Sequence, residues 1–311
     1  MEEPIDHITR DFMNKRRFAF QPALCILLVL SFSNFLTAQT RVLVWADEFN
    51  EQAIDTSTWK FVGGPSNDNV QYYTNRDKNA KIAGDNLQII ALKESYAGYN
   101  YTSSMLVTKN VIDWRYGRIE ASIKLPSSRG FVPAFWLLPA DDRYGWWPSS
   151  GEIDIMEHPT NEIINIYGTV HTAAYNSFNG SGSRGSITQI NDAESAYHVY
   201  AVEWTPDKID FFVDDQKYFT FNNDHSGTAT WPFDQPFYLI LNLAVGGDWP
   251  GNPDNSTQFP QQMLVDYVRV YGAPRPTAAI PQVGHAWADA RPTPGLWLIP
   301  AEPWSLLRPL R

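Results

Sequence analysis

Short runs in which apolar and polar residues alternate recur from residue 42 to residue 271, and turn-forming residues separate them. Such runs predict β-strands, because successive side chains of a strand point to opposite faces of the sheet. The pattern is clearest in residues 198–221, where two tight turns divide three runs. The predicted strands occupy residues 42–45, 87–92, 104–107, 116–125, 198–204, 209–213, 216–221, 237–245 and 265–271.

No long stretch of the chain has the apolar periodicity of an amphipathic helix. Many short strands over about 230 residues are typical of an all-β fold in which two sheets pack as a β-sandwich. We therefore predict that residues 41–271 form one β-sandwich domain.

Residues 1–38 have the pattern of an export signal peptide. A basic group at 15–17 precedes an apolar run at 24–36, and small residues around Ala38 form a plausible cleavage point. The run is short for a membrane span, so we expect a secreted or periplasmic protein without a membrane anchor after cleavage. Because the first twelve residues are unusually acidic for such a leader, we hypothesise that translation starts at Met13.

The single cysteine, Cys25, lies inside this predicted signal peptide. A mature chain without it has no disulfide, no cysteine nucleophile and no cysteine metal site. At the other end, residues 272–311 are rich in proline and show no period, which predicts a largely disordered tail or linker.

Composition narrows the class of partner. The 311 residues carry a formal charge of −10, with 43% hydrophobic and 19% charged residues, which favours a globular domain with a large core. The acidic balance argues against nucleic acid and anionic membranes. The 12 tryptophans and 15 tyrosines are what a sugar-binding groove needs, since aromatic faces pack on apolar sugar faces.

One stretch, residues 151–158 with the sequence Gly-Glu-Ile-Asp-Ile-Met-Glu-His, places three carboxylates within six residues. On a strand, Glu152 and Asp154 share one face, and the isoleucines between them point to the other. Glu157 has the wrong spacing for that face. A β-bulge around Ile155 and Met156 would restore it, and bulges are common where a side chain must be re-aimed.

The spacing of these glutamates is typical of one kind of chemistry. With a bulge, Glu152 and Glu157 are effectively four strand positions apart, roughly 13 Å between their Cα atoms. Side chains that lean together leave carboxyl groups about 5–6 Å apart, close to the separation in retaining glycosidases and too short for inverting ones. The sequence alone also allows a solvated acidic strand face.

The stretch Glu152-Ile-Asp-Ile-Met-Glu157 resembles the E-x-D-x-x-E signature of glycoside hydrolase family 16, and residues 147–152 resemble its laminarinase (endo-1,3-β-glucanase) branch. The resemblance covers residues 41–271. It implies a concanavalin-like jelly roll with a concave substrate cleft. It also implies a secreted, retaining endo-β-1,3-glucanase with Glu152 as nucleophile, Glu157 as acid/base and Asp154 as assisting carboxylate.

The same resemblance implies cleft residues that would contact the polysaccharide. The residues alone leave other roles open, because arginine is also typical of a charged surface, and tryptophan or histidine of a core. Of two adjacent tryptophans in a loop before the motif, we expect one to pack inward, since exposed tryptophans are costly unless they bind something. The implied contacts are Asn69, Arg118, Trp136, Trp146, Trp147, His171 and Trp249.

The chemistry itself requires no cofactor in this resemblance. Glu48, the Gly84 carbonyl and Asp266 match positions that bind calcium in similar enzymes, and oxygen ligands suit calcium. Ordinary surface acids are the alternative. We expect a monomer.

Three other functions compete. Hydrolases of mixed-linkage β-glucan share the fold but usually lack the extra residue that Met156 supplies here. Hydrolases of marine galactans such as agar or carrageenan can share the bulged motif. A non-catalytic β-glucan-binding module would lose the catalytic acids, and all three are present.

Overall fold

The computed structural model describes residues 41–66 and 68–272. The predicted signal peptide, the proposed start at Met13 and the predicted tail beyond residue 272 lie outside these residues. The described residues form strands β1 to β18 and no helix, as the sequence pattern predicts. This part of the chain accordingly holds no helix that could span a membrane.

One sheet has seven antiparallel strands and carries the acidic motif on β11, near its centre. Its neighbours are β10 on one side and β12 on the other. In order across the sheet, the strands are β13 (Arg184–Gln189), β12 (Asn165–His171), β11 (Glu152–Glu157), β10 (Phe131–Pro139), β17 (Phe237–Val245), β8 (Met105–Val107) and β2 (Lys60–Phe61).

The other sheet has eleven strands, and its only parallel pair joins β4 to β7. Strand β1 (Leu43–Asp47) pairs with β18, and β5 (Ala80–Ile82) pairs with β6. The main path runs through β16 (Gln216–Asn222), β15 (Lys208–Val213), β14 (His198–Trp204), β9 (Gly117–Lys124), β18 (Gln261–Tyr271), β6 (Leu87–Tyr96), β7 (Tyr99–Ser103), β4 (Gln71–Tyr73) and β3 (Gly64–Pro65).

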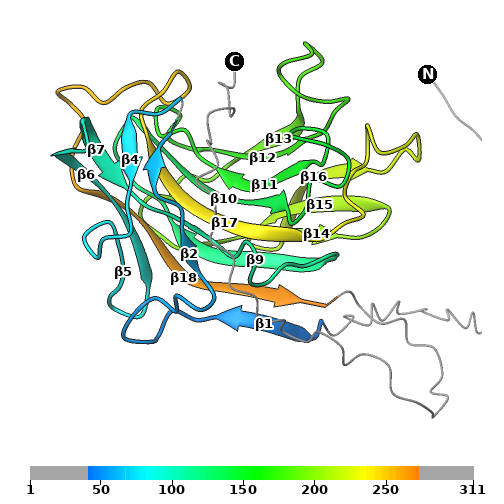
Figure 1. Ribbon diagram of the computed structural model, residues 1–311, viewed down its shortest axis with the longest axis horizontal. Helices are drawn as coiled ribbons and strands as arrows, with labels where there is room; N and C mark the ends of the chain where they lie inside the picture. Colours follow the sequence, from blue (N-terminus) through cyan, green and yellow to red (C-terminus); the bar gives the residue numbers. More distant parts are fainter. Residues whose placement is uncertain (1–40, 67, 273–311) are drawn as a thin grey trace, which may run out of the picture. The chain divides into compact units, whose positions relative to one another are not determined.

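The two sheets share one hydrophobic core. Ile153 and Phe135 from the seven-stranded sheet belong to the same buried cluster as Val202, Phe211 and Ile119 from the eleven-stranded sheet. Figure 1 shows β10, β11 and β17 in one layer, beside the layer of β9, β14 and β18. The predicted β-sandwich is therefore confirmed.

The strand bounds within residues 198–222 agree closely with those that the sequence pattern predicts. Strand β14 has the predicted bounds, and β15 and β16 differ from theirs by one residue. The turn between β15 and β16 is formed by Asp214 and Asp215, both with positive φ (48° and 61°). A two-residue hairpin turn requires this conformation at both positions, and aspartate tolerates it better than most residues.

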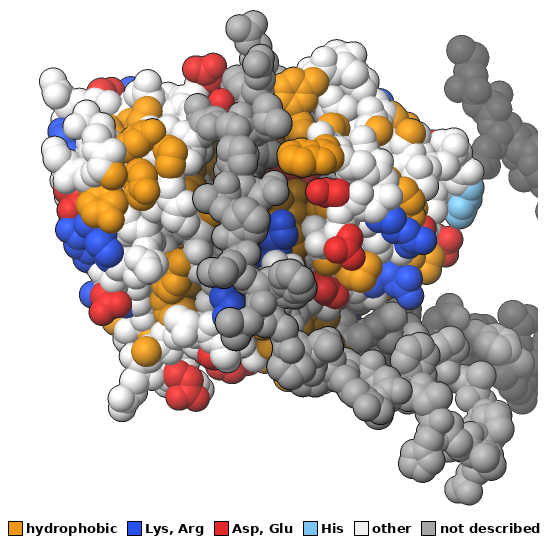
Figure 2. All heavy atoms as spheres, viewed as in Figure 1, with side chains coloured by type: hydrophobic (Ala, Val, Ile, Leu, Met, Phe, Trp, Pro, Cys, Tyr) orange, Lys and Arg blue, Asp and Glu red, His pale blue; other side chains and the backbone are white. Residues whose placement is uncertain are grey.

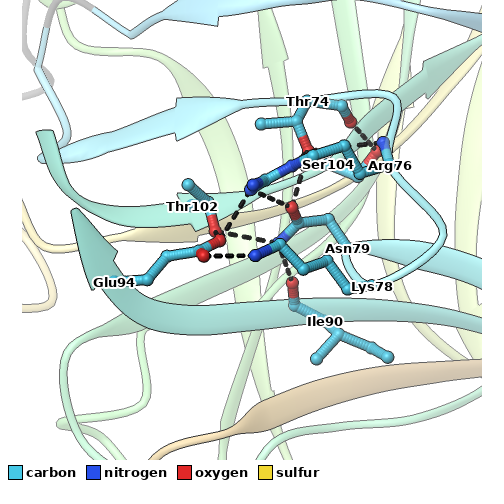
Figure 3. A network of polar contacts seen from close by, with 8 residues as sticks. All are labelled: Thr74, Arg76, Lys78, Asn79, Ile90, Glu94, Thr102 and Ser104. Atoms are coloured by element: carbon cyan, nitrogen blue, oxygen red, sulfur yellow. Dashed lines mark hydrogen bonds and ion pairs between the residues drawn. The ribbon is translucent and has the colours of Figure 1, made fainter. Parts of the chain in front are cut away.

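A buried polar network fixes the β6–β7 hairpin to the segment before β5 (Figure 3). The Asn79 side chain is fully buried, and its amide donates to the Ile90 carbonyl and to Thr102 Oγ1, each at 3.0 Å. Arg76 Nη2 donates to Glu94 Oε1 at 2.6 Å. Because every buried polar atom of Asn79 has a partner, the network rigidifies this end of the sandwich.

Candidate active site

Strand β11 departs from regular alternation within the acidic motif. Opposite β12, Asp154 pairs with Thr169 and Glu157 pairs with Tyr167, so three steps along β11 match two steps along β12. The register of β11 against β10 shifts at the same place. The predicted β-bulge is thus confirmed.

The bulge turns two consecutive side chains inward. Ile155 and Met156 are both buried in the core, and Glu157 returns to the face that holds Glu152. Gly151 precedes the motif with φ +89°, and a Cβ there would lie 2.8 Å from Pro232. Only glycine fits this close approach, which sets the direction in which β11 begins.

The three carboxylates line one cavity of about 200 Å³ on the open face of the seven-stranded sheet. This brings Glu152, Asp154 and Glu157 together, as the motif predicts. Their neighbours come from β4, β8, β10, β17 and three loops. Of the cleft residues that the resemblance implies, four line this cavity: Asn69, Trp136, Trp147 and Trp249.

Glu152 is held by a tryptophan from the loop before β11. Trp147 Nε1 donates a hydrogen bond of 2.8 Å to Glu152 Oε2. His171 Nε2 lies 3.8 Å from the other oxygen, Oε1. Trp147 packs inward and Trp146 is 67% exposed, which is the division expected for the two adjacent tryptophans.

Asp154 and His171 form the base of the site. Both are almost fully buried, and His171 Nε2 lies 3.2 Å from Asp154 Oδ2. The register of the β11–β12 pair explains this contact. His171 lies opposite Glu152, and Asp154 lies two residues further along β11. With Glu152 they also form the only group of three such side chains, in the described residues, spaced closely enough to hold a metal ion.

Burial raises the pKa of all three carboxyl groups. The pKa of Glu152 rises to about 8, through burial and the negative charge of Asp154, although His171 and the Trp147 hydrogen bond lower it. Burial raises the pKa of Asp154 to about 7. The pKa of Glu157 is raised well above its ordinary value by burial and by the charges of Asp154 and Glu152. The three groups therefore cannot all be ionised near neutral pH.

The hydrogen bonds distinguish the two glutamates. Within the described residues, Glu157 accepts no hydrogen bond, whereas Glu152 accepts one from Trp147. A donor favours the ionised form of a carboxyl group, and its absence favours the protonated form. This arrangement suits Glu152 as the carboxylate that attacks and Glu157 as the acid that donates a proton.

The aromatic walls are fixed by contacts of their own. Trp136 Nε1 donates to Asn242 Oδ1 at 2.7 Å. The Trp249 ring lies nearly perpendicular to the Tyr167 ring (81°), with centroids 5.0 Å apart. Both tryptophans are thus oriented without a ligand. Their contact with a sugar stays a prediction.

Asn69 lines the cavity, but its side chain is already paired. Its amide nitrogen donates to the Gly246 carbonyl at 2.8 Å, and its oxygen accepts from Ser66 Oγ at 2.9 Å. These bonds fix the loop of Asn69 to the loop after β17. Trp146 and His171 do not line the cavity itself, so of the two only His171 touches the catalytic groups.

Arg118 does not belong to the site, and its assignment as a substrate contact is wrong. It lies on β9 of the eleven-stranded sheet and is 4% exposed. Its guanidinium pairs with Glu120 at 2.6 Å, Asp215 at 2.7 Å and Glu203 at 3.3 Å. These ion pairs join β9 to β14 and to the turn between β15 and β16, in the sheet opposite the motif, so Arg118 serves the scaffold.

The predicted calcium ligands are engaged with other groups. Both oxygens of Glu48 accept hydrogen bonds of 2.8 Å from Arg269, and the Gly84 carbonyl accepts one from the Asn86 side chain. Asp266 is exposed. Calcium takes about six to eight oxygen ligands. A guanidinium on Glu48 therefore does not fit the predicted set as it stands.

Several cavity residues escaped the sequence analysis. Asn242 lies in β17, a strand whose nine residues are all buried, and it holds both Trp136 and the Tyr73 hydroxyl. A single polar residue in an otherwise apolar strand was the available signal. Tyr73 and Met105 reach the cavity through strand pairing, which composition does not reveal.

Comparison with known proteins gives a consistent result. Residues 66–269 match the model of glycosyl hydrolases family 16. The chain is 47% identical over 242 residues to a β-glucanase of Rhodothermus marinus, a match that covers 74% of this chain and 84% of that protein.

Solved structures agree with the sequence match. The laminarinase from Rhodothermus marinus superposes with a TM-score of 0.72 at 45% identity, over 75% of this chain and 98% of that one. A non-specific endo-β-1,3(4)-glucanase of family 16 superposes with a TM-score of 0.69 at 41% identity, over 75% and 91%. Similarity at this level extends over the whole sandwich and confirms the jelly-roll fold.

Proposed function

The chain belongs to family 16 of the glycosyl hydrolases, and from this premise we propose that it is an endo-acting β-1,3-glucanase of laminarin-type polysaccharides that retains anomeric configuration. The observation that carries the proposal is the bulged strand β11, with Glu152, Asp154 and Glu157 lining one cavity. The carboxyl groups of a bulged strand are expected about 5–6 Å apart, and an inverting enzyme needs a wider gap to hold a water molecule.

The proposed reaction starts from a shared proton. Near neutral pH the adjacent Glu152 and Asp154 carboxyls hold one proton between them, because burial raises the pKa of both. When the proton rests on Asp154, Glu152 is ionised and attacks the anomeric carbon. Trp147 Nε1 holds the attacking carboxylate in place.

Glu157 serves the leaving group. Its raised pKa keeps it protonated, so it donates its proton to the glycosidic oxygen as the bond breaks. Once the glycosyl–Glu152 ester has formed, the ionised Glu157 removes a proton from the water that attacks it. Retention follows because the anomeric carbon is displaced twice.

The cavity favours a neutral polysaccharide. Among its lining residues are five acids, Asp68, Glu152, Asp154, Glu157 and Asp248, and no lysine or arginine. A sulfated sugar would therefore meet only like charge, at a cost that a low-dielectric site increases. This supports glucan over carrageenan-type galactan. Product analysis distinguishes glucan from agar.

A mixed-linkage β-glucan is the second candidate. It is favoured by the similarity to a non-specific endo-β-1,3(4)-glucanase at 41% identity. The extra residue of the bulge argues for the β-1,3 branch. A binding module without catalysis is the weakest alternative, since all three acids are in place.

Product analysis tests the proposal. We expect reducing sugars from laminarin, with the β-anomer released first by NMR, less from lichenan, and none from agarose or carrageenan. Glu152→Ala should remove hydrolysis and leave the chain folded. Near-normal turnover by that variant, or α-anomer as the first product, would contradict the assignment.

Export and a monomeric state also belong to the proposal. They are supported by the sequence of residues 1–38 and by the absence of any need for a second chain in the chemistry. N-terminal sequencing of protein from the culture medium should begin just after Ala38. Light scattering should give the mass of one chain.

A structural calcium ion is proposed only on the resemblance at Glu48, Gly84 and Asp266. If calcium binds there, Arg269 must leave Glu48. Thermal melting with a chelator should then lower the melting temperature, and added calcium should restore it. An unchanged melting curve would remove calcium from the proposal.

A further inference from the structure

One methionine lies in the wall of the catalytic cavity, and the proposed chemistry does not use it. The described residues hold sulfur only in Met105, Met156 and Met263. Met156 and Met263 are fully buried in the core, whereas Met105 is half-buried and lines the cavity. A cavity of about 200 Å³ admits a small neutral oxidant such as hydrogen peroxide. Met105 is therefore the methionine that such an oxidant can reach.

Strand β8 keeps the Met105 side chain directed at the cavity. Its neighbours Ser104 and Leu106 are fully buried, so Met105 points to the opposite face of the sheet, as strand alternation requires. The strand lies between β17 and β2 in the seven-stranded sheet. The Met105 carbonyl also accepts a hydrogen bond of 3.0 Å from the Val62 amide. The sulfur is thus presented by a paired strand and not by a free loop.

The residue opposite Met105 holds one of the aromatic walls in place. Asn242 pairs with Met105 across β8 and β17, and the Cβ atoms of such a pair lie about 4.5–5.5 Å apart on one face. The Asn242 oxygen accepts from Trp136 Nε1 at 2.7 Å, and its amide nitrogen donates to the Tyr73 hydroxyl at 3.3 Å. The second bond is long for a hydrogen bond, so a competing acceptor can displace it.

Oxidation would place such an acceptor beside Asn242. A sulfoxide turns the flexible, apolar side chain of methionine into a polar one. No lysine or arginine lines the cavity to pair with the new oxygen, and the N–H groups of Trp136 and Asn242 are already bonded. The oxygen must therefore take the Asn242 amide from Tyr73, or lose its water without replacement when a sugar enters. Both outcomes weaken binding.

We propose that Met105 is a site of reversible oxidation, at which hydrogen peroxide converts the thioether to a sulfoxide and weakens the binding of glucan in the catalytic cavity. The sulfur attacks one peroxide oxygen, an S–O bond forms as the O–O bond breaks, and the other oxygen leaves as water after proton transfer. The sulfur loses two electrons, which the peroxide gains. A methionine sulfoxide reductase reverses the change. The effect on glucan rests on the proposed function, whereas the oxidation itself does not.

The test treats the full chain with dilute hydrogen peroxide. Peptide mass mapping should show one added oxygen on Met105 before any on Met156 or Met263. On laminarin, kcat/KM should fall roughly tenfold, through a higher KM, which is the loss expected when one polar group is left poorly paired in the complex. Reduction of the treated protein by methionine sulfoxide reductase should restore the original KM.

Two matched variants separate Met105 from other targets of peroxide. Met105→Leu removes the sulfur at similar volume, so its activity after peroxide should equal that of its own untreated sample. Met263→Leu, in the core on β18, should lose activity as the wild type does.

Three results would overturn the inference. They are an equal loss of activity in Met105→Leu and the wild type, complete oxidation of Met105 with an unchanged KM, and oxidation of Met156 or Met263 ahead of Met105. If the untreated wild-type protein cleaves no laminarin, the proposed function fails first, and the mass map still decides whether Met105 is the oxidised residue.

Discussion

At the scale of single residues, the site is asymmetric in its hydrogen bonds. Trp147 donates to Glu152, and no described residue donates to Glu157. The two carboxyl groups are buried to a similar degree, but this difference in hydrogen bonding suits one to act as nucleophile and the other as acid. Other acid–base pairs likewise have environments that push their pKa values apart. In the proposed reaction, the indole nitrogen of Trp147 is therefore part of what selects Glu152 as the nucleophile.

Replacing Trp147 by phenylalanine tests this directly. The pKa of Glu152 should rise, because the hydrogen bond that lowers it is gone. Glu152 must be ionised to attack, so the acidic limb of the pH profile of kcat/KM should move to higher pH. Trp146→Phe, at the exposed neighbouring position, should leave the profile in place. Equal shifts in both variants would contradict the role given to Trp147.

The buried carboxyls should also reduce stability as the pH rises. The pKa of Glu152 is raised from 4.5 to about 8, so between these values the folded chain binds a proton that the unfolded chain has lost. Folding stability therefore falls across this window. We expect Glu152→Gln to raise the melting temperature, by more near pH 8 than near pH 4.5.

A variant whose melting temperature should change in the opposite direction is the control for this experiment. Ion pairs with Lys78 and Arg76 help to lower the pKa of Glu94 to about 2, so Glu94→Gln should lower the melting temperature at neutral pH. About 1 kcal/mol shifts the melting temperature of a domain of this size by about 2–4 °C, which calorimetry resolves. If Glu152→Gln destabilised the fold at pH 8, the assigned burial effect would be wrong.

At the scale of strands, the sequence predicted those elements whose pattern is local. The bulge at Ile155 and Met156 followed from one mis-spaced carboxylate, and the β14–β16 meander from two turns. The short strands β2 to β5 were missed, because two or three residues give no measurable alternation, and the longer strands β7 and β13 were missed as well.

Contacts between residues on different strands were harder to predict than the strands themselves. Arg118 was assigned to the cleft because the stretch that holds it borders the cleft in the resembling family, yet β9 lies in the opposite sheet. Asn242 was missed because its role depends on contacts with Trp136 and Tyr73, which lie on other strands. Neither the sheet to which a strand belongs nor the register of its pairing is determined by the strand's own sequence.

Arg118→Ala tests the corrected role. It leaves Glu120, which is 7% exposed, without its charged hydrogen-bond donor. We expect a loss of about 2 kcal/mol in the free energy of unfolding, since charged hydrogen bonds contribute about 1.5–3 kcal/mol. The KM for laminarin should not change. A raised KM with unchanged stability would return Arg118 to the substrate.

At the scale of the whole molecule, acidic residues outnumber basic ones, with 34 Asp and Glu against 24 Lys and Arg. The chain has a formal charge of −10. On the face shown in Figure 2, acidic and basic side chains lie interspersed among hydrophobic and uncharged ones. Such a surface neither attracts nor repels a neutral polymer over long distances.

This charge distribution predicts how association depends on salt. With laminarin as substrate, kcat/KM should stay nearly constant between low and physiological ionic strength, since screening has no charge on the substrate to act on. A reaction that accelerated strongly with added salt would indicate an anionic substrate, whose repulsion the salt relieves. Steady-state rates at constant pH and temperature measure this.

The bulge also affects how the choice of polysaccharide can change in such an enzyme. Ile155 and Met156 pack in the core and direct Glu157 toward the cavity, whereas the loops carrying Trp249 and Asn69 form walls of that cavity. The reacting groups and the groups that select the polymer thus depend on different parts of the chain. Loop exchange can retune which glucan is chosen while bond cleavage is preserved, and changes to the interior at β11 would alter cleavage for every glucan alike.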